Sequence, residues 1–402
     1  MSASGDDDSV LTRPILVVLG LSFLGFTLEY ILRPVIPLIV LDRGGDVVLV
    51  GVVAAVHSLP SILFRPAIGR LIDGWNQRLL LRVGAVVTTL APLGLILPGL
   101  ISLLPVRFVQ GSGWALFSVS NHALMARRSP ANRRGEASGY FMAMPALGNL
   151  IGPGIGVGLY LSTGAIGPAL IATGLGIAAT TMAFRVRLTG PPARTEDEGP
   201  RPFVEQLIEP SALPSTLMIA AFMLPQSLFS VFAPVYALEV GAPLEWLALY
   251  FPFYGLVLFV TQLVVGRASD RYGRHAAIVA GCTTGALGVL IALLGDSLVT
   301  FAIGAGFYAL GVSLVSPTMS ALTIDRARPD RLGAAMATYS VGYQLSSGVG
   351  SLVWGGVLAT GGFSAAFAFA IACQVGTMAI SVRMRSTVDS PSPAAPSADA
   401  FD

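Results

Sequence analysis

The chain contains an internal repeat at an offset of 197 residues. Residues 69–73, which read Gly-Arg-Leu-Ile-Asp, return at 266–270 as Gly-Arg-Ala-Ser-Asp. The same offset holds without a gap in an earlier stretch, where it carries Pro37 to Pro234, Leu41 to Leu238, Asp42 to Glu239 and Gly44 to Gly241. An ungapped match over two helices and their loops is hard to produce by chance. We therefore read the chain as two copies of one unit.

The composition indicates that both copies lie in a membrane. The chain is 54% hydrophobic and 11% charged, with a mean hydropathy of +0.75, whereas soluble proteins carry about 25% charged residues. Each membrane crossing needs about 20 apolar residues. The pattern predicts an all-α membrane protein with twelve transmembrane helices. They cover roughly 15–40, 48–70, 78–98, 100–126, 137–161, 165–186, 214–238, 245–266, 275–295, 298–322, 333–358 and 362–382.

The repeat groups these helices into two pseudo-symmetric six-helix bundles. Two such halves in an apolar chain favour a transporter whose substrate path lies at their interface. The acidic N-terminal segment lacks the features of a signal peptide, so we expect the first helix to be retained. The tail is rich in Pro, Ala and Ser and is expected to be disordered. The predicted divisions are 1–14 (cytoplasmic segment), 15–186 (first bundle), 187–213 (cytoplasmic linker), 214–385 (second bundle) and 386–402 (tail).

The arginines predict the orientation in the membrane. They gather after every second helix, whereas the loops on the other side hold Arg43 alone among acidic residues. The positive-inside rule then places both termini in the cytoplasm, and the cell membrane is the expected location. The arginines that set this orientation are Arg127, Arg128, Arg133, Arg134, Arg185, Arg187, Arg194, Arg201, Arg267, Arg271, Arg274, Arg326, Arg328, Arg331, Arg383 and Arg385.

The repeated loops at 69–78 and 266–275 resemble motif A of the major facilitator superfamily. Each has a glycine, an aspartate four residues later, and basic residues after it. In the first copy Gly74 and Gln77 replace basic residues that are usual in the family. The resemblance implies two six-helix bundles that alternate between outward-open and inward-open forms, with these loops as a conformational switch. The residues carried over are Gly69, Asp73, Arg78, Gly266, Asp270, Arg271, Gly273 and Arg274.

The fourth predicted helix resembles motif B of the same family. It reads Arg107-Phe-Val-Gln110-Gly111, and Arg107, Trp114 and Asn121 fall on one face at helical spacing. The resemblance implies a part for Arg107 in proton coupling, in line with the cost of an arginine inside a crossing helix. The alternative is that Arg107 extends to the outer surface.

The fifth predicted helix resembles motif C, which the family associates with exporters and antiporters. Its residues are Gly148, Gly152, Pro153 and Gly156, and the matching helix of the second copy lacks the proline. Bare helix surface at the glycines is expected to permit close packing against the second half. Pro153 is expected to bend the helix.

Glu29 is the one carboxylate deep inside a predicted crossing, and its counterpart in the second copy is Gln226. A carboxylic acid in an apolar cavity can bind and release a proton as its surroundings change. Glu29 and Arg107 are therefore the proton-coupling candidates. In the alternative reading, Arg33 forms a static ion pair with Glu29.

The candidates for the substrate cavity are polar or aromatic residues within predicted helices. They are Glu29, Arg33, Trp114, Asn121, Gln226, Tyr254, Tyr339 and Tyr343. His57 and His122 lack partners at ligand spacing, so they are interpreted as packing residues. We predict neither a metal site nor a cofactor.

The prediction is proton-coupled efflux of a small amphipathic or drug-like compound by alternating access, resembling the twelve-helix drug:proton antiporters. The alternatives are a proton-coupled transporter of a sugar, amino acid or other metabolite, and, more remotely, a membrane enzyme or a substrate sensor. The expected partners are the small-molecule substrate, protons and the lipid bilayer, without nucleic acid. A monomer suffices because the path lies between the chain's own halves.

Overall fold

A computed structural model describes residues 11–74, 77–129, 134–186, 209–265, 273–327 and 332–383. Throughout these residues the chain is helix joined by turns, with no β-strand. The predicted linker is therefore described only from residue 209 onward, and residues 1–10 and the tail 386–402 lie outside the described part. So do Gly266, Asp270 and Arg271. Gly69 and Asp73 are described only as part of the backbone of α3.

The helices fall into two series. The first contains α1 (Arg13–Leu32), α2 (Val35–Asp42), α3 (Val47–Gly74), α4 (Gln77–Leu90), the 3-10 helix η1 (Ala91–Ile96), α5 (Leu103–Arg128), α6 (Arg134–Thr163) and α7 (Ile166–Arg185). The second contains η3 (Pro210–Ala212), α9 (Leu213–Met223), α10 (Gln226–Ser230), α11 (Ala233–Glu239), η4 (Leu244–Trp246), α12 (Leu247–Val265), α14 (Arg274–Leu294), α15 (Leu298–Arg326) and α16 (Leu332–Arg383).

The repeat in the sequence returns in the backbone. Helix α4 begins at Gln77 and α14 begins at Arg274, which is 197 positions later. The turns that follow α2 and α11 contain Gly44 and Gly241, with positive φ angles of 80° and 65°. An L-residue with a side chain rarely adopts such angles, so glycine at both positions preserves the same turn.

Ten helical segments of the described residues are long and apolar enough to cross a membrane. Helix α5 has 26 residues but is more polar, because it carries Arg107, Gln110 and Asn121. Helix α16 merges the two last predicted helices into 52 residues with a non-helical Gly362 (φ 64°) between them. A straight helix of that length would extend ~78 Å, more than twice the ~30 Å hydrocarbon core.

The first helix of each series is broken, although the sequence predicts continuous helices over 15–40 and 214–238. The first break is at Arg33–Pro34, between α1 and α2. The second series breaks at Leu224–Pro225 and again after α10. Proline lacks an N–H and its ring clashes with the preceding turn, so the hydrogen-bond ladder stops there.

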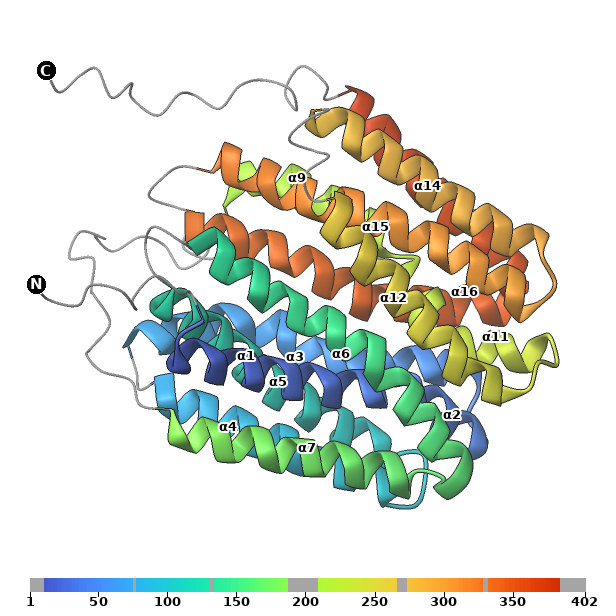
Figure 1. The fold of residues 1–402 in the computed structure, drawn as a ribbon. Helices are drawn as coiled ribbons and strands as arrows, with labels where there is room; N and C mark the ends of the chain where they lie inside the picture. The colour runs from blue at the N-terminus through green and yellow to red at the C-terminus, as the bar shows by residue number, and fades with distance from the viewer. Residues whose placement is uncertain are drawn as a thin grey trace, which may run out of the picture.

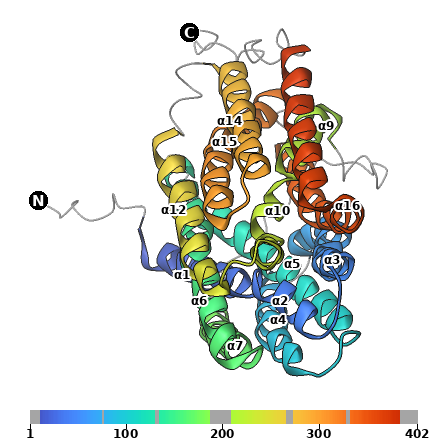
Figure 2. The same ribbon diagram turned by 90° about the vertical axis from the view of Figure 1, so that its right-hand side faces the viewer.

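The two series lie on opposite sides of the molecule, blue to green and yellow to red in Figure 1. They meet along two lines, α3 against α16 and α6 against α12 (Figure 2). A Cβ on Gly51 of α3 would lie 2.4 Å from the Ser351 carbonyl oxygen of α16. A Cβ on Gly255 of α12 would lie 2.7 Å from Leu150 Cα of α6. Missing side chains therefore permit both close approaches.

Three of the motif C glycines pack differently from the expectation. Gly148, Gly152 and Gly156 face α1 of their own series, against residues such as Thr27 and Ile31. Their spacing of four residues places them on one face of α6. Gly154, on another face, is the glycine that approaches α12, near the Ala248 carbonyl oxygen and the Pro252 ring. Among these glycines, Gly154 is therefore the one that packs closely against the second series, in place of Gly148, Gly152 and Gly156.

Candidate functional site

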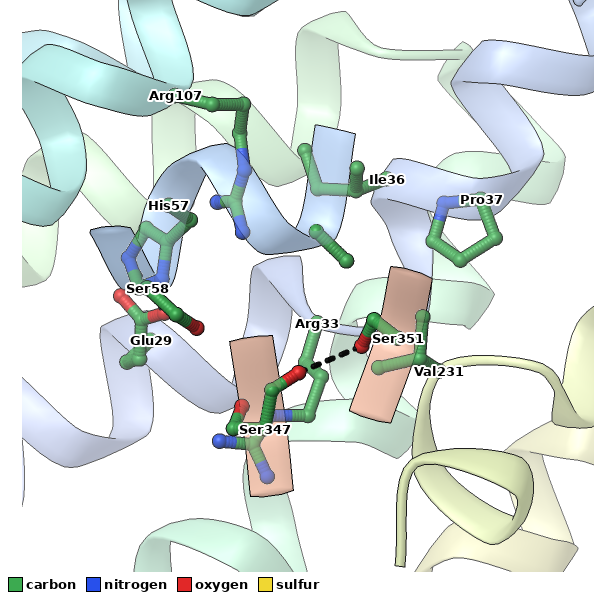
Figure 3. A pocket seen from close by; sticks show the side chains of 11 residues that line it. Glu29, Arg33, Ile36, Pro37, His57, Ser58, Arg107, Val231, Ser347 and Ser351 are labelled. Atoms are coloured by element: carbon green, nitrogen blue, oxygen red, sulfur yellow. Dashed lines mark hydrogen bonds and ion pairs between the residues drawn. The ribbon is translucent and has the colours of Figure 1, made fainter. Parts of the chain in front are cut away.

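A small pocket lies where the two series meet, and it is lined mainly by polar side chains (Figure 3). Its volume is about 30 Å³, which is room for water molecules. Residues of the α1–α2 region, α3 and α5 form most of the wall, and the second series adds Val231 and two serines of α16. The lining consists of Glu29, Arg33, Ile36, Pro37, Ala54, His57, Ser58, Arg107, Val231, Ser347 and Ser351.

Glu29 lies at the centre of a buried polar network. Its side chain comes from α1 and is 6% exposed. One carboxylate oxygen, Oε1, is 3.1 Å from Nε2 of His57 in α3. The other oxygen accepts a hydrogen bond of 3.2 Å from Nε2 of Gln110 in α5. Three helices therefore converge on one carboxylate, and each of its oxygens lies close to a polar side chain of another helix.

Arg107 joins this network through Gln110. Its guanidinium donates a 2.7 Å hydrogen bond to Oε1 of Gln110, whose amide in turn donates to Glu29. The side chain of Arg107 is 6% exposed, so it is inside the protein and not at the outer surface. The two residues are three positions apart on α5, which places them on the same face of the helix.

Gly111 brings α5 close enough to α3 for these contacts. A Cβ at this position would lie 2.0 Å from the carbonyl oxygen of His57, which no structure tolerates without a shift of the backbone. The glycine next to Gln110 thus fixes the distance between the helix that carries His57 and the helix that carries Arg107.

Arg33 lines the same pocket but forms no ion pair with Glu29 in the described residues. It occupies the break between α1 and α2. Its guanidinium lies over the Tyr30 ring, 4.7 Å from the centroid. The titratable side chain next to Glu29 is His57, not Arg33 as the static-pair alternative has it.

The other cavity candidates in the first series lie outside the pocket wall. Trp114 packs edge-on against Phe26, with ring centroids 4.9 Å apart. Asn121 is buried and donates a 2.7 Å hydrogen bond to the Ser22 hydroxyl. Both residues therefore hold α5 against α1.

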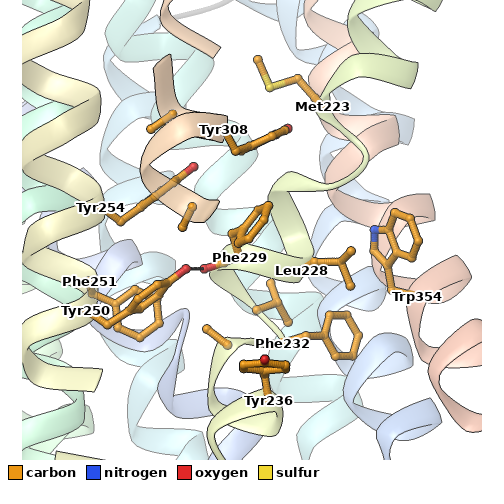
Figure 4. Packing of buried hydrophobic residues seen from close by; sticks show 14 of the residues in the cluster. Met223, Leu228, Phe229, Phe232, Tyr236, Tyr250, Phe251, Tyr254, Tyr308 and Trp354 are labelled. Atoms are coloured by element: carbon orange, nitrogen blue, oxygen red, sulfur yellow. Dashed lines mark hydrogen bonds between the residues drawn. The ribbon is translucent and has the colours of Figure 1, made fainter. Parts of the chain in front are cut away.

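The candidates in the second series also contact protein groups. Gln226 begins α10, and Tyr254 of α12 is buried with its ring stacked on Tyr250 (Figure 4). The hydroxyl of Tyr339 donates to the Ser316 carbonyl oxygen at 3.0 Å. Tyr343 hydrogen-bonds to the Ser316 hydroxyl. These two tyrosines form a polar contact between α15 and α16, away from the pocket wall.

The described part of motif A connects neighbouring helices. Arg274, at the start of α14, pairs with Asp325 of α15 at 2.6 Å, directly after Gly273 with φ 87°. At the equivalent place in the first series, Gln77 of α4 donates to the Ser120 carbonyl oxygen of α5 at 3.0 Å. The residue that departs from the family motif therefore still connects the matching pair of helices.

His57 is the site residue that the sequence interpretation missed. It has no metal-ligand spacing, and the nearby polar residues of α3 are serines, which do not single it out. Its partner Glu29 comes from another helix, so only the packing of α1, α3 and α5 brings the two together. The sequence offered one usable signal, the glycine next to Gln110, because Gly111 is where α5 approaches the backbone of His57.

Known proteins match this chain in sequence and in fold. The model of the Major Facilitator Superfamily matches residues 18–287 and 219–399. The staphylopine export protein of Staphylococcus aureus (strain Mu50 / ATCC 700699) is 23% identical over 235 residues. That match covers 57% of this chain and 59% of the relative, so the chain spans less than two thirds of the relative's length.

Solved transporters share the fold at low sequence identity. A POT family transporter in complex with 5-aminolevulinic acid has a TM-score of 0.78 and 15% identity, over 94% of this chain and 97% of that one. The nucleoside transporter NupG has a TM-score of 0.76 and 10% identity, over 92% and 100%. Together with the family match over most of the chain, these likenesses lead to one conclusion. The chain belongs to the Major Facilitator Superfamily.

Proposed function

We propose that this transporter exports a small compound in exchange for protons, and that Glu29 is the residue that carries the proton. The observation that carries this proposal is the position of Glu29. Its carboxylate is buried in a pocket that both series line, and it contacts His57 and, through Gln110, Arg107. Buried ionisable groups inside a membrane protein mark ion or substrate paths.

The hydrogen bonds suggest how a proton and the compound exclude each other. As an anion, Glu29 faces Nε2 of His57 with one oxygen and accepts a hydrogen bond from Gln110 on the other. A proton on either oxygen turns that acceptor into a donor, so one of the two contacts must rearrange. Loading of a proton therefore changes the pocket that the compound occupies, and the release of one favours the binding of the other.

We further propose twelve crossings in two six-helix bundles, residues 15–186 and 214–385. The ten apolar spans, the polar α5 and the bend of α16 at Gly362 support this division. Binding sites for drug-sized ligands have volumes of about 300–1,000 Å³, far above that of the pocket. A compound can enter only when the contacts α3–α16 or α6–α12 separate, which is alternating access.

We also propose that both termini lie in the cytoplasm of a cell-membrane protein. The support is that arginines gather at these helix ends, as the positive-inside rule expects on the cytoplasmic side. Arg128 of α5 donates to the Pro14 carbonyl oxygen at 2.9 Å, and Arg82 of α4 donates to that of Phe184 at 3.0 Å. Export, as opposed to import, is supported by motif C and by the similarity to an export protein.

Transport by Glu29→Gln in proteoliposomes tests the proposal. Wild-type protein with an imposed proton gradient, and a panel of dyes, antibiotics and metabolites, is expected to move at least one compound against its concentration. Glu29→Gln should lose the dependence on the gradient because the amide cannot take up a proton. Glu245→Gln, which alters a carboxylate of the short helix η4 outside the pocket, is the matched control. Gradient-driven transport by Glu29→Gln at the wild-type rate would contradict the assignment.

A further inference from the structure

We propose that Arg33 binds a carboxylate of the transported compound, and that the compound is an amphoteric acid with a protonated amine as well. This inference rests on the proposed transport function and adds the chemical class of its substrate. It follows from three features of the pocket: the unused donors of Arg33, the balance of charges in the wall, and the serines that the second series contributes.

The guanidinium of Arg33 has donors to spare. In the described part of the chain it makes neither a hydrogen bond nor an ion pair. Its Cζ lies over the Tyr30 ring, 4.7 Å from the ring centroid. A contact with a ring face needs no hydrogen-bond acceptor, so the five N–H groups of a guanidinium can still bind acceptors elsewhere. Because Arg33 lines the pocket, a planar, bidentate acceptor such as a carboxylate fits this arrangement.

The charges of the pocket wall do not cancel. Arg33 and Arg107 face a single carboxylate, that of Glu29, and His57 adds no negative charge. Arg107 is nearly buried, and its Nε has no partner in the described residues. An uncompensated charge away from water is costly. A compound with one more negative than positive charge would complete the balance.

Serines from both series add hydroxyl groups to the pocket that Arg33 lines. Ser58 comes from α3, and Ser347 and Ser351 come from α16 (Figure 3). The Ser351 hydroxyl donates to the Ser347 carbonyl oxygen at 2.7 Å, whereas the hydroxyls of Ser58 and Ser347 have no hydrogen bond in the described residues. A carboxylate on Arg33 can therefore also accept from Ser347, so the compound would contact both halves of the transporter.

A simple organic cation fits this pocket less well. Glu29, its only counter-charge, is already engaged by His57 and Gln110. Two guanidinium groups in the same wall would repel a ligand that carries positive charge alone. A protonated amine is tolerated near Glu29 only when the same molecule supplies carboxylates for the arginines.

Binding to purified protein in lipid nanodiscs tests this inference without a proton gradient. The probes are N-benzyliminodiacetate, which carries two carboxylates and a protonated amine, its dimethyl ester, and benzyltrimethylammonium. Isothermal titration calorimetry should show the acid binding about tenfold or more tightly than either other probe. Arg33→Gln should weaken binding of the acid by about tenfold or more, and Arg33→Lys should restore part of it.

Arg82→Gln is the matched control, because the Arg82 guanidinium also lies over an aromatic ring, that of Phe184 at 4.9 Å, but outside the pocket. It should bind the acid like the wild type. The inference is overturned if the ammonium compound binds as tightly as the acid or if the wild type does not bind the acid at millimolar concentration. It is also overturned if Arg33→Gln, folded with an unchanged Tm, binds the acid normally. These measurements need no transport. The acid can therefore fail to bind while Glu29 still carries the proton, and the acid can bind even if Glu29 does not carry the proton.

Discussion

The carboxylate of Glu29 depends on partners that other helices supply. His57 contacts one oxygen directly, and Gln110 contacts the other while it also accepts from Arg107. In the low-dielectric interior such hydrogen bonds polarise one another, and loss of one member leaves the others partly unsatisfied. His57 is the member whose removal can be tested most cleanly, since it leaves Gln110 and Arg107 in place.

Replacing His57 by Asn is expected to lower gradient-driven transport by about tenfold or more, because Glu29 loses the imidazole that lies 3.1 Å from its Oε1. The measurement is the initial rate in proteoliposomes under a fixed proton gradient. His122→Asn is the control, since His122 contacts the Ser118 carbonyl oxygen and the Phe141 ring outside the pocket. Equal rates for the two variants would exclude a functional part for His57.

At the level of elements, the two broken helices differ in what surrounds the break. The break after α1 places Arg33 in the pocket. The breaks around α10 lie in an aromatic cluster, where side chains satisfy the carbonyl oxygens that the helix leaves free (Figure 4). Trp354 Nε1 donates to Leu224 at 2.8 Å, and the Tyr250 hydroxyl donates to Phe229 at 2.6 Å. The break in the first copy thus lies at the pocket, whereas the breaks in the second lie in packed aromatic side chains.

Trp354→Phe should destabilise the protein by about 1–3 kcal/mol, because the Leu224 carbonyl oxygen loses its donor inside the protein. Thermal unfolding of the purified protein in detergent measures this as a lower Tm. Trp246→Phe is the matched control, since Trp246 is 53% exposed and its replacement should leave Tm nearly unchanged. A similar Tm for the two variants would show that the break does not depend on the indole.

At the level of the whole molecule, the same repeat relates the two contacts between the series. The offset of 197 carries α3 onto α12 and α6 onto α16. The contact α3–α16 therefore corresponds to the contact α12–α6, with Gly51 at one and Gly154 at the other. A rocking motion about such a pair of equivalent contacts can open one membrane face while the other stays closed.

A disulfide across α3 and α16 is expected to stop transport. A Cβ on Gly355 would lie 3.3 Å from Val48 Cα, so the two backbones are close enough for a disulfide to form after a small adjustment. Val48→Cys with Gly355→Cys, in a chain whose Cys282 and Cys373 are replaced by Ala, should lose transport on oxidation and regain it with reductant. The single-cysteine variants should respond to neither treatment. Full transport by a verified cross-linked protein would refute the rocking motion.

Sequence by itself determined the features that depend on local order. The repeat, the apolar segments and the arginines between them follow from residue type and spacing, and the repeat is visible in the matching bounds of α4 and α14. The neighbouring positions of Arg107 and Gln110 on α5 also follow, because a helix has a fixed periodicity. Glu29 stood out because it is an acid within an apolar segment.

Only the tertiary structure decided which side chains meet. It gave Glu29 the partner His57 in place of Arg33, and it turned Gly148, Gly152 and Gly156 toward α1 while Gly154 approached α12. Helical spacing shows which residues share a face, but the neighbour of that face depends on how helices distant in sequence pack. In lipid this packing rests on small residues and close contacts, which leave little trace in hydropathy.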